Sequence, residues 1–279
     1  MSYKISSSKL RHPLLKPIFE ELYSYFKEAD ISFYVIGATA RDIIMEIHNE
    51  ASGRATLDLD IAIAISDWKE FSAVEIGLVS LDNFTKDPKQ KQRFIYQSDF
   101  QLDIVPYGEI MKEGDKIFWP PDENFAMTIL GFLEVEKATQ QVQIDKGVTL
   151  NVASLSGIFV LKIIAWEDRN HKGNKDADDI AFIMGNYLEI NQSKAMEFYT
   201  EIYTDDFTIF LAGTKLLGKD VLEILKDHTD TIEKVNSIIE RQIKLEEGSV
   251  LINQIIETNK LKYEEVLQGL KNMVSELKQ

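Results

Sequence analysis

One ten-residue segment, TLDLDIAIAI at positions 56–65, limits most strongly what this chain can fold into. Its alternation is typical of a β-strand, because successive side chains of a strand point to opposite faces. Leu57 and Leu59 then share one face. Asp58 and Asp60 share the other, about 6–7 Å apart along the strand. The apolar neighbours predict a central strand, so two acidic side chains are expected within the sheet of an α/β domain.

Two carboxylates on a central strand repel each other and lose hydration. A divalent cation removes both costs, and Mg²⁺ in proteins takes oxygen ligands, usually a few carboxylates together with substrate phosphates. The pattern Asp-x-Asp is also frequent by chance, and on the open side of a sheet both residues could be solvated. The segment alone leaves both interpretations open.

Two other segments favour the metal site. A predicted buried strand at 33–36 ends at Gly37, and the small residues after it begin a helix, where backbone N–H groups can approach a phosphate. Asp103 lies alone between apolar residues of a later predicted strand, a costly position unless it faces a cation. Two-metal phosphoryl transfer accounts for all of these features.

The composition sets broad limits. The 279 residues are 44% hydrophobic and 28% charged, which is ordinary for a soluble globular protein. The net charge of −15 disfavours a broad nucleic-acid surface but leaves a local basic patch open. The absence of cysteine excludes a thiol nucleophile and cysteine-based metal sites. No apolar run approaches the roughly 20 residues of a membrane span, and the first residues lack a signal-peptide pattern. We therefore expect a cytoplasmic protein with no membrane partner.

The order of predicted elements indicates an α/β domain followed by an all-α domain. The first part combines helices with strands, in this order: a helix at 13–28, the strand at 33–36, a helix from about Ala40, the aspartate strand, a helix near 67–81, and a hairpin of RFIYQ and FQLDIVPYG. From Ser154 onward the spacing of apolar residues is helical almost to the end.

We place the domain boundary at residue 115. A small mixed-sheet core is expected at 1–115, and a mainly helical domain that binds substrate or nucleotide at 116–279. Three short alternating segments, FLEVEKA, QVQID and VTLNVAS, are expected to form small strands at the start of the second domain.

Three motifs in this order resemble the polymerase-β nucleotidyltransferase superfamily. They are Ile36-Gly37-Ala38-Thr39-Ala40-Arg41-Asp42, Thr56-Leu57-Asp58-Leu59-Asp60 and Leu102-Asp103-Ile104. Within the superfamily they are most similar to the AbiEii/AbiGii nucleotidyltransferase toxins. That family usually has Gly-Gly or Gly-Ser after the first strand. Ala38 departs from this pattern, because it keeps the backbone donor but lacks a hydroxyl.

The resemblance implies a set of site residues in the first domain. Asp58, Asp60 and Asp103 would be the catalytic carboxylates that hold two Mg²⁺ ions. The nucleotide would be bound by Gly37, Ala38, Arg41 and Thr56.

A weaker similarity to the toxins lies in the helical half. Lys162 occurs in VLKIIAWEDR, and Lys175-Asp176-Ala177-Asp178-Asp179-Ile180 follows. From the residues alone, Lys162 either extends its ammonium group to solvent or reaches into a cleft. The resemblance implies that Lys162 meets the triphosphate of the nucleotide. Arg169, Lys175 and Asp176 would complete the same binding wall.

These observations predict an enzyme that transfers a nucleoside monophosphate from an NTP to a hydroxyl acceptor with two Mg²⁺ ions. In a toxin of an AbiE-like toxin–antitoxin or phage-defence system, the acceptor would be tRNA or a protein, and an antitoxin would be the partner. A small-molecule acceptor of the aminoglycoside kind competes, because an acidic protein suits a cationic acceptor. A non-catalytic nucleotide-binding protein is a third alternative, and the presence of all three carboxylates argues against it.

Overall fold

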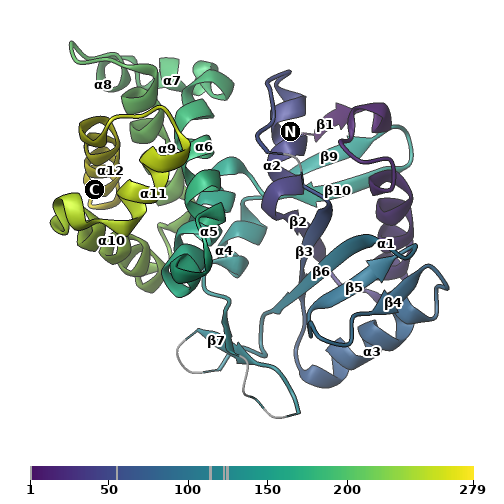
Figure 1. The fold of residues 1–279 in the computed structure, drawn as a ribbon. Helices are drawn as coiled ribbons and strands as arrows, with labels where there is room; N and C mark the ends of the chain where they lie inside the picture. Colours follow the sequence, from purple (N-terminus) through teal and green to yellow (C-terminus); the bar gives the residue numbers. More distant parts are fainter. Residues whose placement is uncertain (1, 55, 113–114, 122, 124–125) are drawn as a thin grey trace. The chain divides into compact units, whose positions relative to one another are not determined.

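The computed structural model of the chain describes residues 2–54, 56–112, 115–121, 123 and 126–279 (Figure 1). These residues form two compact units, which divide between Ser154 and Leu155. The first unit is a mixed α/β structure and the second is helical, as predicted from the sequence. Among the described residues, no helix has both the length and the apolar character that crossing a bilayer requires.

The first unit is built on an eight-stranded mixed sheet with the strand order β1-β9-β10-β2-β3-β6-β5-β4. Its strands are β1 (Ser2–Ile5), β2 (Phe33–Ile36), β3 (Asp58–Ala64), β4 (Phe84–Lys86), β5 (Arg93–Tyr96), β6 (Phe100–Tyr107), β9 (Gln140–Ile144) and β10 (Val148–Val152). β3 pairs antiparallel with β2 and parallel with β6. The aspartate strand is therefore central, which confirms the prediction (Figure 1).

The helices of the first unit are α1 (Leu15–Ala29), α2 (Gly37–Ile47), α3 (Trp68–Val79) and α4 (Phe132–Lys137). α1 buries Ile18, Phe19, Leu22 and Phe26 at helical spacing and ends at Asp30 in the left-handed conformation. α2 packs on β2 and β3, so the turn between β2 and α2 lies directly beside the aspartate strand.

Leu57 does not share the buried face of Leu59, although the alternation predicted that it would. Its side chain is 72% exposed, whereas Leu59 is fully buried. The physical reason is that β3 begins only at Asp58, so the alternation of a strand does not yet apply at Leu57.

The segment 116–154, which we expected in the second domain, belongs to the first compact unit. QVQID and VTLNV form strands as predicted, but they extend the first sheet, where β10 pairs with β2. A separate ribbon, β7 (Lys116–Phe118) and β8 (Ala126–Thr128), precedes them. Trp119, just after β7, is buried against the rings of Trp68 and Phe71 in α3, with centroids 5.0 and 5.2 Å away.

The prediction of a strand at FLEVEKA was wrong, because this segment forms the helix α4. Gly131 precedes α4 with φ of 90°, and the Val135 N–H donates to the Gly131 carbonyl at 2.9 Å. In so short a segment, the spacing of apolar residues fits a strand and a helical turn equally well.

The second unit contains the helices α5 (Leu155–Arg169), α6 (Lys175–Ile190), α7 (Gln192–Glu197), α8 (Tyr199–Ile202), α9 (Ile209–Leu225), α10 (Thr229–Lys244), α11 (Val250–Thr258) and α12 (Tyr263–Leu277). α9 packs against both α6 and α12. Gly269 of α12 allows close approach to α9, since a Cβ there would lie 2.7 Å from Phe210 Cε1 and 3.0 Å from Thr214 Cγ2.

We expect Gly269→Ala to lower the free energy of unfolding by about 1–3 kcal/mol, because the added methyl group overpacks the α9–α12 contact. Gly185→Ala in α6 is the matched control, since nothing lies within 4 Å of a Cβ at that position. The control should stabilise the helix by up to about 1 kcal/mol. Denaturant unfolding measures both. Equal effects of the two substitutions would contradict the packing described for Gly269.

A candidate carboxylate site on the central strands

Three aspartates lie on one face of the two central strands. Asp58 and Asp60 are half-buried, whereas the alternate residues Leu59 and Ile61 are fully buried. In the parallel pairing of β3 with β6, Asp60 is the direct partner of Asp103. Paired residues of neighbouring strands point to the same face, and the strands are about 4.8 Å apart. The pairing therefore brings together the three carboxylates predicted from the sequence.

The turn from β2 into α2 lies against Asp60. Ile36, the last residue of β2, is the strand partner of Asp60, and Gly37 follows with φ of 67°. A Cβ at Gly37 would collide with Asp60 Oδ2 and lie 3.2 Å from Asp60 Cγ. Glycine is thus required here both by the backbone conformation and by the close approach. The carboxylate of Asp60 also lies near the positive end of the α2 dipole, which favours its negative charge.

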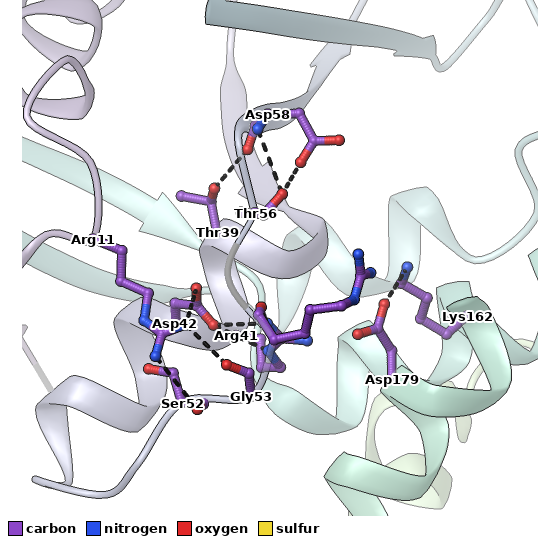
Figure 2. Close-up of polar contacts among 11 residues, drawn as sticks. Arg11, Thr39, Arg41, Asp42, Ser52, Gly53, Thr56, Asp58, Lys162 and Asp179 are labelled. Atoms are coloured by element: carbon purple, nitrogen blue, oxygen red, sulfur yellow. Dashed lines mark hydrogen bonds and ion pairs between the residues drawn. The ribbon is translucent and has the colours of Figure 1, made fainter. Parts of the chain in front are cut away.

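Two threonines position Asp58, as Figure 2 shows. The Thr39 hydroxyl of α2 donates to the Asp58 carbonyl at 3.0 Å. The Thr56 hydroxyl donates to Asp58 Oδ1 and accepts from the Asp58 N–H at 3.4 Å. Thr56, predicted as a nucleotide ligand, is therefore placed to orient a carboxylate of the site.

Two arginines hold the loop that leads into β3 (Figure 2). Arg41 is 2% exposed, and its guanidinium donates to Asp42 Oδ1 and, at 2.8 Å, to the Arg54 carbonyl. Arg11 donates to the Gly53 carbonyl at 2.8 Å and lies 3.8 Å from Asp42 Oδ2. Arg41 was predicted to bind nucleotide, but the partners shown here are protein groups that anchor this loop on α2.

Arg93 of β5 is a site residue that the sequence analysis missed. Arg93 Nε and Nη2 donate to Asp103 Oδ1 and Oδ2 at 2.7 and 2.8 Å, a bidentate pair. The hydrogen bond with Asp103 raises the pKa of Arg93, and the nearby charges of Asp103 and Asp58 add to this effect. Arg93 and Asp103 are direct partners in the β5–β6 hairpin. Counting residue pairs outward from the predicted turn would have found this contact.

The residues at this site fit Mg²⁺ in their chemistry, because three carboxylates on one face supply hard oxygen ligands. Within the part of the chain that the structure describes, however, no group of three or more acidic or histidine side chains is arranged as metal ligands. The contact of Arg93 is consistent with this absence, because its guanidinium occupies both oxygens of the Asp103 carboxylate.

The second unit holds a separate cluster of charged residues. The Lys162 ammonium lies 3.1 Å from Asp176 Oδ1 and 2.7 Å from Asp179 Oδ2 (Figure 2 draws the pair with Asp179). Arg169 forms a bidentate pair with Asp176 at 2.6 and 2.8 Å. Lys162 therefore does not extend to solvent, and its side chain is only 17% exposed. Of the four residues predicted here, Lys162, Arg169 and Asp176 meet, whereas Lys175 is exposed at the start of α6.

The pKa values in this cluster follow from burial and pairing. Burial by itself lowers the pKa of Lys162, but the charges of Asp179 and Asp176 outweigh burial and raise it. Burial by itself raises the pKa of Asp176, but Arg169 and Lys162 outweigh burial and lower it. Each ionised form is therefore favoured in the folded protein.

Comparisons with known proteins give fold-level similarity only. No family model matches the chain, and no curated protein matches it. An antigenic nucleotidyltransferase-like protein from Paracoccidioides brasiliensis is similar in structure over 71% of this chain and 90% of that one, with 15% identity and a TM-score of 0.42. The antibiotic-resistance factor ANT(2'')-Ia matches over 66% and 98%, with 11% identity and a TM-score of 0.33. The CdnE cyclic dinucleotide synthase of Elizabethkingia meningoseptica matches over 97% and 93%, with 8% identity and a TM-score of 0.29.

We expect Gly37→Ala to destabilise the protein by roughly 1–3 kcal/mol, because alanine is strained at this φ and its methyl group meets Asp60. Gly147→Ala is the control, since a Cβ there has nothing within 4 Å and Gly147 does not have a positive φ. Thermal unfolding of both variants in EDTA makes the comparison. A Gly37→Ala variant as stable as the Gly147→Ala variant would contradict the close approach of Asp60 to the turn.

The lowered pKa of Asp176 predicts a pH dependence of stability. Its contribution is present above the unfolded pKa of about 3.9 and is lost as the pH falls through the lower folded pKa. We therefore expect Asp176→Asn to reduce the loss of stability between about pH 4.5 and pH 2.5. Asp168→Asn, an exposed position on α5, is the control. Denaturant unfolding across this range tests the prediction, and parallel curves for wild type and Asp176→Asn would contradict it.

Proposed function

We propose that this chain is a metal-dependent nucleotidyltransferase, an enzyme that transfers a nucleoside monophosphate from an NTP to a hydroxyl acceptor. The observation that carries the proposal is the register of the central strands, in which Asp60 pairs with Asp103 and Asp58 lies two residues away on the same face. Three carboxylates within a sheet are poorly explained by stability alone, because they repel one another and are partly desolvated.

In the proposed reaction the acceptor oxygen attacks the α-phosphorus of the NTP. A new oxygen–phosphorus bond forms, the bond from the α-phosphorus to the bridging oxygen breaks, and pyrophosphate leaves with that oxygen. Mg²⁺, when bound, supplies positive charge that stabilises the phosphates and lowers the pKa of the acceptor hydroxyl. Asp58, Asp60 and Asp103 would hold two such ions. Asp103 would help to hold the ion that faces the acceptor, and the proton of the hydroxyl would pass to water.

We propose further roles for residues of each unit. The backbone N–H groups of Gly37 and Ala38 begin α2 and are suited to a phosphate. Thr56 would act through Asp58, as a positioning residue. We also propose that Lys162, Arg169, Lys175 and Asp176 take part in nucleotide binding, which rests on the resemblance of their motif. A triphosphate at Lys162 would have to compete with Asp176 and Asp179 for its ammonium group.

The proposed acceptor is a hydroxyl of tRNA or of a protein, as in the toxins that the motifs resemble, with an antitoxin as partner. A small cationic acceptor is the second candidate, because the chain carries a net charge of −15 and would attract a cation. The test is to incubate the protein with Mg²⁺, each labelled NTP in turn, and total tRNA, protein or aminoglycosides. The product that carries the label identifies the acceptor.

We expect Asp58→Asn, Asp60→Asn and Asp103→Asn each to lower the rate of label transfer by at least about 10³-fold, because each removes a charge that stabilises the metal-bound transition state. Asp99→Asn is the control. Asp99 is exposed in the turn between β5 and β6, so this substitution removes the same charge at the edge of the sheet and should leave the rate unchanged. Circular dichroism verifies that each variant is folded.

The same assay can contradict the proposal. Near wild-type transfer by any one of the three site variants in Mg²⁺ would remove that carboxylate from the reaction. If the true acceptor is missing, wild type will transfer label to none of these acceptors. Binding of nucleotide would still show as a higher melting temperature of the protein in Mg²⁺ and a non-hydrolysable NTP. An unchanged melting temperature at millimolar ligand would exclude nucleotide binding as well.

A further inference from the structure

The carboxylate site of the first unit contains a positive charge of its own. Arg93 contacts both oxygens of Asp103, and their partnership is set by the hairpin register. The three aspartates carry a charge of −3 when ionised, and Arg93 supplies +1. Arg93 therefore takes the place of a cation beside Asp103. Its guanidinium hydrogen-bonds to the carboxylate that a metal ion would need as a ligand.

Arg93 is placed so that it can leave Asp103. It is the first residue of β5, and its side chain is 23% exposed. Arg41 provides the contrast, since its guanidinium is almost fully buried and holds the carbonyl of a loop. An arginine at the start of a strand, with an exposed part to its long side chain, can change rotamer without disturbing the core.

A second carboxylate lies close to Arg93. The Asp87 N–H donates to the Arg93 carbonyl at 3.0 Å, so the two residues face each other where β4 ends and β5 begins. Asp87 is half-buried, and its Oδ1 accepts from the N–H groups of Lys89 and Gln90. Asp87 can thus receive the guanidinium when it leaves Asp103.

We propose that Arg93 is an internal counter-cation that holds Asp103 in the metal-free protein and must move toward Asp87 before Asp103 can ligate a metal ion. This inference rests on the proposed function, because it assumes that the three aspartates are metal ligands. Its consequence is that Arg93 opposes metal binding at Asp103. Metal binding to Asp58 and Asp60 does not require Arg93 to move, so the two parts of the site differ in affinity.

The test measures Mn²⁺ binding by calorimetry and by electron paramagnetic resonance, without nucleotide. We expect Arg93→Met to bind Mn²⁺ at least about fivefold more tightly than wild type, because a competing positive charge is gone. The gain should disappear when Asp103→Asn is added to Arg93→Met. Asp87→Asn should weaken Mn²⁺ binding, because the alternative partner of Arg93 loses its charge while its turn-forming oxygen is kept.

Two further variants sharpen the experiment. Lys86→Met is the matched control, since it removes a positive charge from β4 whose partner is Glu75 and not a site aspartate. Its Mn²⁺ affinity should stay within about twofold of wild type. Arg93→Lys keeps the charge but not the bidentate geometry, so it should fall between wild type and Arg93→Met. Arg93→Lys and Asp87→Asn carry the test if Arg93→Met does not fold.

The outcomes separate this inference from the proposed function. Suppose that wild type binds Mn²⁺ and that Asp60→Asn abolishes this binding. If the affinity of Arg93→Met for Mn²⁺ is then equal to or lower than that of wild type, Arg93 does not oppose the metal and the inference is overturned. If Asp87→Asn and wild type bind Mn²⁺ with the same affinity, Asp87 is not the alternative partner of Arg93. If neither wild type nor Arg93→Met binds Mn²⁺, with or without a non-hydrolysable NTP, the metal site itself is wrong and both proposals fall.

Discussion

The concentration of negative charge at the middle of a sheet is the constraint on which the rest of the first unit depends. β3 lies between β2 and β6, and its pairing with β6 sets Asp60 beside Asp103. Carboxylates in such a position are stable only if their charge is compensated and their oxygens are hydrogen-bonded. The surrounding structure supplies part of this, since the hydroxyl of Thr56 donates to Asp58 and the guanidinium of Arg93 offsets the charge of Asp103.

The charged cluster of the second unit obeys the same rule with a different balance. Lys162 and Arg169 face Asp176 and Asp179, two positive charges against two negative ones. Because the charges balance and Arg169 is 52% exposed, this cluster requires no further ion. The carboxylate site of the first unit has three negative charges and one positive charge. That imbalance is the physical reason for proposing metal chemistry at the first site, whereas the proposed ligand binding at the second rests on the resemblance of its motif.

Backbone geometry around the carboxylates has a direct role in the proposed chemistry. Gly37 lets the start of α2 approach Asp60 to a distance that any side chain would prevent. Arg11 and Arg41 hold the carbonyl groups of the loop before β3, so the strand begins at a defined residue, Asp58. Strand register and an anchored loop fix the backbone positions of the aspartates, which limits the backbone reorganisation that the proposed chemistry would require.

The sequence by itself determined the features that depend on near neighbours in the chain. The alternation in 56–65 predicted a strand with both aspartates on one face, and the structure forms it over Asp58–Ala64. Gly37 predicted the turn into a helix, and the hairpin around Ser98 followed from two alternating runs. Only the tertiary structure decided which strands pair. The insertion of β10 beside β2 and the pairing of Lys162 with Asp179 join segments whose local patterns carry no record of their partners. Periodicity reports which face of an element is apolar, but the partner of a buried charge is selected by long-range packing, where compensation of that charge outweighs local preference.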